Sequence, residues 1–180
     1  QMADIENSIV KPTLEALREK GIEYTGILYP GLKLSSRGTK VLEFNARFGD
    51  PECQVYMRLL ESDLLDILDP DVNDSIYGTV RWKTGYAVNI VLASGGYPDA
   101  YKKGFPIEGI EKAEETKSVI VFHAGTAYEH GELVTSGGRV LGVSALGATL
   151  KEALDRAYEA VGAIHFENMY FRRDIGAKAL

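Results

Sequence analysis

Three polar residues alternate along one stretch of the chain, and their types suit the binding of a metal ion and a phosphate. Glu43, Asn45 and Arg47 are each two residues apart. In a β-strand their side chains would lie on one face, about 7 Å from one to the next. Carboxylate and amide oxygens are ligands that Mg²⁺ prefers, and a guanidinium can bind a phosphate bidentately. Together, a metal and a cation neutralise charge at a phosphoryl group in transfer.

A solvated strand face is the simpler interpretation of the same spacing. Antiparallel strands commonly have one face in the core and one in water. The alternation places Val41 with the polar trio, and we expect the apolar residues between them to face a core. Those residues are Leu42, Phe44, Ala46 and Phe48. Alternation alone favours the solvated face, so the choice depends on the residues that follow.

The residues that follow resemble a known family. Arg-Phe-Gly-Asp-Pro-Glu at residues 47–52, with Gln54 two positions on, resembles the signature of phosphoribosylamine–glycine ligases, also called glycinamide ribonucleotide synthetases. The sequence Glu-Phe-Asn-x-Arg at residues 43–47 resembles the metal-binding strand of ATP-grasp ligases in general. Further segments resemble the same family, so that nearly the whole chain is covered: residues 9–14, 24–29, 93–98, 122–126, 135–141 and 170–176.

The resemblance implies a role for each matching residue. It implies that Glu43 and Asn45 bind Mg²⁺ or Mn²⁺, and that Arg47 is catalytic because it steadies the transferred phosphate. Five further residues are implied on the substrate side, each with a structural alternative. Asp50 and Glu52 could instead cap a helix, and the glycines of the second group could instead form a tight turn beside a solvated arginine. The second group is Gly137, Gly138 and Arg139.

The implied activity is an ATP-dependent ligation in purine biosynthesis. In this family ATP, the co-substrate, phosphorylates the carboxylate of glycine, and 5-phosphoribosylamine then displaces the phosphate. No glycine-rich phosphate loop occurs upstream of residue 43. We therefore expect the carboxy-terminal portion of a longer enzyme, inactive without its amino-terminal portion. Two alternatives stay open: another ATP-grasp carboxylate–amine ligase, and a non-catalytic scaffold or regulatory fragment.

Composition narrows the class of protein. The chain has 180 residues, of which 45% are hydrophobic and 26% charged, as in globular proteins. A net charge of −6 disfavours binding to nucleic acid or to an anionic membrane. The longest uncharged run, residues 84–98, is too short and too polar to cross a bilayer. A single cysteine, Cys53, fits a reducing compartment, so we expect a cytoplasmic protein; no general base is near it in sequence, and we expect no catalytic role for it.

The first 68 residues predict a helix, two strands and a second helix. The first helix should be kinked or broken at Pro12 and end at Gly21. Strands over residues 24–34 and 39–48 should pair as a hairpin. The second helix should run to about Leu68, with Asp50 as its cap and Pro51 at its first position. The apolar face of the first helix consists of Ile5, Ile9, Val10, Leu14 and Leu17.

The rest of the chain predicts mostly strands and one helix. Strands are expected over residues 86–93, 118–123, 132–135 and 139–144. Thr149 and Glu152 form a capping box before a helix whose apolar face is Leu150, Leu154, Ala157, Val161 and Ile164.

The fold class is therefore α+β. We expect the end of an ATP-grasp domain over residues 1–68 and a small sheet-plus-helix carboxy-terminal domain over 83–180. Turn-forming residues and an acidic run over residues 61–74, six acids without a base, predict a linker at 69–82. A long surface loop within one domain is the alternative.

Overall fold

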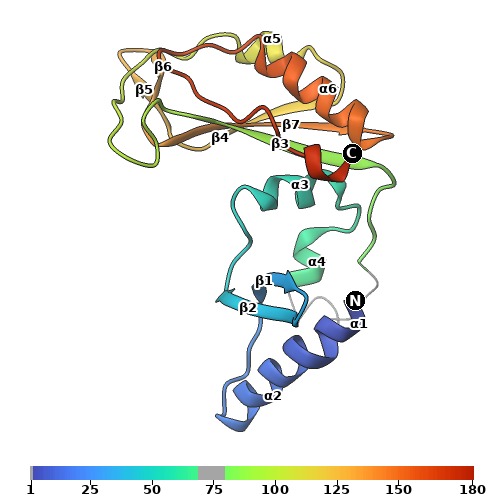
Figure 1. The fold of residues 1–180 in the computed structure, drawn as a ribbon. Helices are drawn as coiled ribbons and strands as arrows, with labels where there is room; N and C mark the ends of the chain where they lie inside the picture. Colours follow the sequence, from blue (N-terminus) through green and yellow to red (C-terminus); the bar gives the residue numbers. More distant parts are fainter. Residues whose placement is uncertain (1, 69–79) are drawn as a thin grey trace. The chain divides into compact units, whose positions relative to one another are not determined.

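The computed structural model describes residues 2–68 and 80–180, which group into two compact units. The first contains residues 2–49 and 64–68, and the second contains 50–63 and 80–180 (Figure 1). Helices occur in both units, and every pair of adjacent strands is antiparallel within the described residues, so the α+β prediction is confirmed. No helix in this part of the chain has the length and apolar character needed to cross a bilayer. Most of the predicted linker lies outside the described residues, and the predicted domain boundaries stay predictions.

The first unit begins with a helix of three segments: α1 (Met2–Ile5), a π-helical turn (Glu6–Val10) and α2 (Lys11–Glu19). Pro12 lies in the first turn of α2, directly after the wider π turn. Proline donates no hydrogen bond and crowds the preceding turn, which explains the wider turn there. The helix continues through Pro12, so the predicted alternative of a break was wrong. Gly21 ends the helix with φ +72°, and the amides of Gly21 and Ile22 donate to the carbonyls of Arg18 and Leu17. This is the Schellman arrangement, which confirms Gly21 as the helix stop.

A hairpin follows, as predicted, but both strands are shorter than expected. β1 (Tyr29–Ser35) pairs with β2 (Gly38–Asn45). Residues 24–28 precede the strand, and β2 ends at Asn45 instead of continuing to residue 48.

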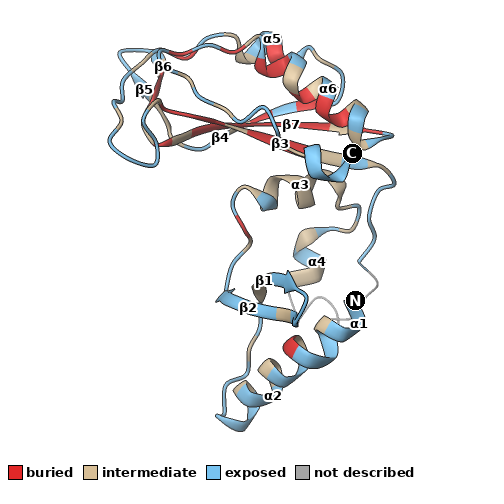
Figure 2. Cartoon of the chain, in the orientation of Figure 1, coloured by how far each residue is buried: buried red, intermediate tan, exposed pale blue. Residues whose placement is uncertain are grey.

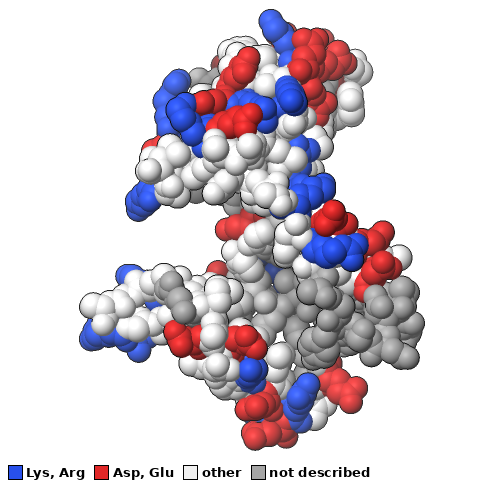
Figure 3. Space-filling view, turned by 90° about the vertical axis from the view of Figure 1, so that its right-hand side faces the viewer, with Lys and Arg blue, Asp and Glu red and all other residues white. Residues whose placement is uncertain are grey.

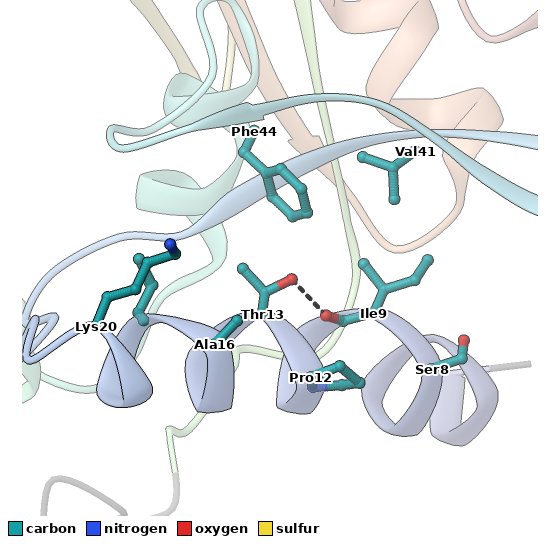
Figure 4. A pocket seen from close by; sticks show the side chains of 9 residues that line it. Ser8, Ile9, Pro12, Thr13, Ala16, Lys20, Val41 and Phe44 are labelled. Atoms are coloured by element: carbon teal, nitrogen blue, oxygen red, sulfur yellow. Dashed lines mark hydrogen bonds between the residues drawn. The ribbon is translucent and has the colours of Figure 1, made fainter.

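A β-bulge in this hairpin changes which side chains share a face. Gly31 pairs with Glu43 but Leu32 pairs with Val41, so Leu42 is an extra residue. One extra residue reverses the alternation from that point. Val41 and Phe44 therefore both point toward α2 (Figure 4), whereas Leu42 is 69% exposed. The prediction that Leu42 and Phe44 face one core while Val41 lies with the polar trio was wrong.

The predicted helix from Asp50 to Leu68 is two helices, α3 (Glu52–Leu59) and α4 (Leu64–Leu68). The chain becomes extended at Leu60 because it pairs there with Trp82, and the amides of Glu61 and Ser62 donate to the carbonyl of Arg81. Pro51 takes the N-cap position itself.

The Asp50 side chain does not cap α3. No side-chain hydrogen bond caps this helix, and the Asp50 carboxylate accepts hydrogen bonds from Gln54 and Arg139 instead. The predicted cap was therefore wrong.

The second unit is built on a three-stranded sheet of order β3-β7-β4, from β3 (Tyr86–Ala93), β4 (Val119–His123) and β7 (Arg139–Gly147). A smaller sheet pairs β5 (Thr126–Glu129) with β6 (Glu132–Thr135). The four predicted strands are confirmed, with β7 three residues longer than expected. α5 (Ile110–Glu114) and a short 3₁₀ turn (Ala177–Ala179) complete the unit.

α6 (Leu150–Val161) covers one face of the larger sheet, and α3 lies on the other (Figure 1). The hydroxyl of Thr149 accepts a hydrogen bond from the amide of Glu152 at 3.1 Å, which confirms the predicted cap. Four of the five residues predicted for the apolar face of this helix are buried, and Leu150 is partly buried. Figure 2 shows that buried residues concentrate in this unit. Positive and negative side chains are interspersed over the face of the unit seen in Figure 3.

Candidate functional site

The two predicted metal ligands lie side by side at the end of β2. Nδ2 of Asn45 donates a hydrogen bond to Oε1 of Glu43 at 3.2 Å. Gly31 is the partner of Glu43 across the hairpin, and an added Cβ at this glycine would lie 3.0 Å from Cγ of Glu43. The glycine therefore leaves room for the glutamate side chain to lie across β1. The pair Glu43–Asn45 is the part of the predicted trio that the strand brings together.

The donor set of this pair fits a magnesium-like ion. The hydrogen bond occupies one carboxylate oxygen and the amide nitrogen, so Oε2 of Glu43 and Oδ1 of Asn45 are the two hard oxygen atoms that could bind a metal ion. Mg²⁺ takes about six oxygen ligands and keeps several for water and phosphate. In residues 2–68 and 80–180, no group of three or more His, Cys, Asp or Glu side chains is arranged so that it could hold a metal ion. The pair is thus a partial site, whose other ligands would come from substrate, water or elsewhere.

Arg47 is not held beside this pair by strand geometry. β2 ends two residues before it, and Nη1 of Arg47 donates to the carbonyl of its neighbour Phe48 at 3.0 Å. The side chain is exposed. The strand therefore places Glu43 and Asn45 together, as their spacing predicted, but it does not extend to Arg47. The catalytic role of Arg47 stays a prediction.

Two predicted substrate-side residues that are 89 positions apart in sequence form an ion pair. Nη2 of Arg139, at the start of β7, contacts Oδ2 of Asp50 at 2.9 Å, and Nη1 donates to the carbonyl of Asp50 at 2.8 Å. Gln54 donates to the other carboxylate oxygen at 3.2 Å. The arginine is therefore fixed in orientation, and two of its donors are already engaged.

Glu52 and Cys53 begin α3 beside Asp50 in sequence. Glu52 is exposed in the first turn, where its charge favours the positive end of the helix. Burial raises the pKa of the Cys53 thiol, and the negative charge of Asp50 raises this pKa further. A raised pKa gives less thiolate, which agrees with the expectation that Cys53 is not a nucleophile.

The two glycines before Arg139 belong to the connection between β6 and β7. Oγ of Ser94 donates to the carbonyl of Gly137 at 2.8 Å, and the amide of Ser94 donates to that of Gly138 at 2.8 Å. An added Cβ at Gly138 would lie 2.2 Å from the ring of Tyr97. Close packing therefore explains why glycine stands there, and the phosphate role of Gly137 and Gly138 stays a prediction.

One buried polar residue without a hydrogen-bond partner was not anticipated from the sequence. Asn89 lies in the middle of β3, and its side chain has no hydrogen-bond partner among the described residues. The signal in the sequence was a single amide within the otherwise apolar run of residues 87–93.

Two family models match the chain. Residues 1–53 match "Phosphoribosylglycinamide synthetase, ATP-grasp (A) domain", and residues 87–178 match "Phosphoribosylglycinamide synthetase, C domain". A phosphoribosylamine–glycine ligase of Caldanaerobacter subterraneus is 48% identical over 97% of this chain. The trifunctional purine biosynthetic protein adenosine-3 of Gallus gallus is 46% identical over 98% of it. The chain spans 41% of the length of the first relative and 18% of the second.

Solved structures are similar over most of the chain. A phosphoribosylamine–glycine ligase of Thermotoga maritima has a TM-score of 0.79 and 38% identity, over 90% of this chain and 40% of that one. An N5-carboxyaminoimidazole ribonucleotide synthetase of the same organism has a TM-score of 0.60 at 16% identity, over 88% of this chain and 40% of that one. The second similarity concerns the fold alone.

Proposed function

The chain belongs to the phosphoribosylglycinamide synthetase family, and on this basis we propose that it forms the carboxy-terminal part of an ATP-dependent ligase. The reaction joins glycine to 5-phosphoribosylamine and gives glycinamide ribonucleotide, ADP and phosphate. The observation that carries the proposal is the Glu43–Asn45 pair, which lies within the segment that matches the ATP-grasp model. The single cysteine and the relatives' biosynthetic role favour a cytoplasmic location.

Activation of a carboxylate is the chemical problem in this reaction. Oxide is a very poor leaving group, so the amine cannot displace it directly. Transfer of the γ-phosphoryl group of ATP to a carboxylate oxygen of glycine forms glycyl phosphate and releases ADP. The amine nitrogen of 5-phosphoribosylamine then attacks the acyl carbon, the C–O bond to phosphate breaks, and the nitrogen loses a proton.

Glu43 and Asn45 would hold a divalent cation, Mg²⁺ or Mn²⁺, through Oε2 and Oδ1. When bound, such an ion neutralises charge on the ATP phosphates. Gly31 keeps the space over β1 in which the Glu43 side chain lies, so the carboxylate stays beside the amide. Arg47 would steady the phosphoryl group in transfer through its guanidinium.

On the substrate side we propose a role for the Asp50–Arg139 ion pair. Asp50 positions the guanidinium through two hydrogen bonds, and the donors that remain free could bind an anionic substrate group. Gly137 and Gly138 would bring backbone amides to the same end of β7, and Glu52 would shape the approach. These assignments extend the family resemblance to the residues of this chain.

The remaining parts of an ATP site are proposed to lie in an amino-terminal portion. The relatives are more than twice as long as the matched segment, and residues 1–42 contain no glycine-rich phosphate loop. We therefore propose that the 180-residue chain alone does not turn over ATP.

The test is the replacement of one metal ligand in the intact enzyme. Loss of groups that merely support metal ligands costs about 10–100-fold, so Glu43→Gln should lower kcat/KM by about 100-fold or more. Its matched control is Glu15→Gln, the same change on the exposed face of α2, which should leave kcat/KM unchanged. The measurement is ADP release with glycine and 5-phosphoribosylamine over a range of Mg²⁺ concentrations.

Other results would point elsewhere. Near-normal turnover of Glu43→Gln at saturating Mg²⁺ would remove Glu43 from the metal site. Faster ADP release with another carboxylic acid than with glycine would indicate a different carboxylate–amine ligase. An intact enzyme without Mg²⁺-ATP dependence would indicate a scaffold or regulatory protein.

A further inference from the structure

The two helices on the larger sheet differ in how completely they pack against it. α6 buries five residues, and the hydroxyl of Thr149 caps its first turn. α3 lies on the opposite face (Figure 1), where none of its residues is fully buried and no side-chain hydrogen bond caps it. Local opening costs least where few apolar contacts are buried, so release of α3 from the sheet costs less free energy than release of α6.

The interface between α3 and β3 also contains polar atoms without partners. Among the described residues, the buried side-chain atoms that lack a hydrogen bond are Oε1 of Gln54, Nε of Arg58, and Oδ1 and Nδ2 of Asn89. Gln54 and Arg58 are four positions apart, so they share one face of α3. Asn89 lies on the face of β3 that points away from the core under α6. Burying such atoms without partners costs free energy, which opening of α3 would recover by exposing them to water.

The far end of α3 is attached to two other segments of the second unit. The amide of Lys83 donates to the carbonyl of Leu59, the last residue of the helix, at 2.7 Å. Nη2 of Arg58 donates to the carbonyl of Ser118, directly before β4, at 2.6 Å. These contacts hold the end of the helix independently of its start.

The start of α3 is joined to the sheet by hydrogen bonds from a single side chain, within the part of the chain that the structure describes. Nη1 and Nη2 of Arg139, on β7, donate to the carbonyl and the carboxylate of Asp50 at 2.8 and 2.9 Å. Both side chains are partly exposed, so the pair contributes little free energy. This contact can therefore break while the far end of α3 stays attached.

We propose that α3 is a lid with a low free energy of opening, and that the Asp50–Arg139 ion pair is the latch that keeps its start on the sheet. Opening separates Asp50 from Arg139, so the guanidinium loses the orientation that it has when the lid is closed. Docking of α3 thus controls the substrate-side arginine. Only this last step rests on the proposed function, because docking itself involves no substrate.

Hydrogen exchange of backbone amides reports the opening of α3. A helix of eight residues is not stable alone in water, so release from the sheet also breaks its internal hydrogen bonds. The ¹⁵N-labelled 180-residue chain is transferred to D₂O, and NMR follows the amides of residues 56–60 in and after α3 and of residues 154–161 in α6. After correction for intrinsic rates, we expect residues 56–60 to exchange at least tenfold faster.

Removal of the latch tests the role of the ion pair. Arg139→Gln should speed exchange of residues 56–60 by about two- to fivefold, the range expected for a partly exposed ion pair, and leave residues 154–161 unchanged. The matched control is Arg172→Gln, the same change at the exposed Arg172–Asp174 pair of the same unit. This control should leave exchange in both helices unchanged.

A second variant acts on the unpaired amide instead of the latch. Asn89→Leu should slow exchange of residues 56–60 by about fivefold or more, because the closed arrangement no longer buries an amide without partners. Asn7→Leu, the same change at an exposed residue of the first unit, should leave this exchange unchanged. If Asn89→Leu does not fold, Arg139→Gln and its control decide the matter.

Three results would overturn the proposal. Equal protection of residues 56–60 and 154–161 would mean that α3 opens only when the whole unit unfolds. Equal effects of Arg139→Gln and Arg172→Gln would show that the ion pair is not a latch. Unchanged exchange in Asn89→Leu would mean that water molecules bond to the buried amide. Ligase turnover enters none of these measurements, so failure here leaves the proposed function standing.

Discussion

At the scale of single residues, the proposed chemistry depends on a two-residue pair and an ion pair. The amide of Asn45 orients the carboxylate of Glu43, so the two proposed metal ligands would not have to be ordered when an ion binds. Asp50 does the same for Arg139. The Asp50–Arg139 side chains are partly exposed, at 52% and 39%, so we attribute to this pair a positioning role and a stabilisation of at most about 1 kcal/mol.

Cys53 offers a measurement of the charge on Asp50. Because burial and Asp50 both raise the pKa of the thiol, its alkylation by iodoacetamide should show a pH midpoint above that of a free cysteine peptide. Asp50→Asn removes the negative charge and should lower the midpoint, and so speed alkylation at pH 8. Gln54 contacts Asp50 without carrying charge, so Gln54→Ala is the control for loss of the hydrogen bond alone. A midpoint at or below that of the peptide would contradict the burial of this thiol.

At the scale of elements, α6 is the helix whose start is fixed by the most hydrogen bonds from side chains. Its cap hydroxyl accepts from the Glu152 amide, and the Glu152 carboxylate accepts from the amide of Ala148 at 2.6 Å. Thr149→Ala should therefore destabilise the chain by about 1 kcal/mol, within roughly 0.5–2 kcal/mol. Urea unfolding followed at the helix signal measures this loss. Thr84→Ala, at an exposed position of the same unit, should change stability by less than about 0.5 kcal/mol; an equal loss in both variants would contradict the cap.

Local signals in the sequence predicted the elements of the second unit well. Strands β3 and β6 begin and end where expected, and the cap of α6 is at Thr149. These elements depend on neighbouring residues: apolar runs, turn residues and a capping box. The hairpin and the Glu43–Asn45 pair follow in the same way from period-two spacing.

The errors arose where distant residues decide the local structure. The predicted long helix breaks because Leu60 pairs with Trp82, 22 positions away. Asp50 leaves the cap position because Arg139 binds it from β7. The bulge at Leu42 reverses the order in which side chains alternate between the two faces of β2. No residue type near Leu42 predicts this bulge from the sequence. The spacing of residues along one segment does not predict which distant segments contact it.

At the scale of the whole molecule, the two units differ in how completely they bury a core. Among the described residues, one buried hydrophobic side chain, Ile9, lies in the first unit, and the others lie between residues 88 and 166. An apolar groove of about 400 Å³ runs between α2 and β2, with Ile9, Val41 and Phe44 along it (Figure 4). The first unit thus carries the Glu43–Asn45 pair, the proposed metal ligands, on a small framework, in agreement with the proposal that further protein completes the ATP site.

The most direct test of the ligase assignment follows isotope-labelled glycine. The intact enzyme and the 180-residue chain alone are supplied with ATP, Mg²⁺, 5-phosphoribosylamine and labelled glycine under the same conditions. The account predicts labelled glycinamide ribonucleotide and an equal amount of ADP from the intact enzyme, and neither product from the chain alone. An intact enzyme that forms no labelled product, or an isolated chain that turns over steadily, would contradict it.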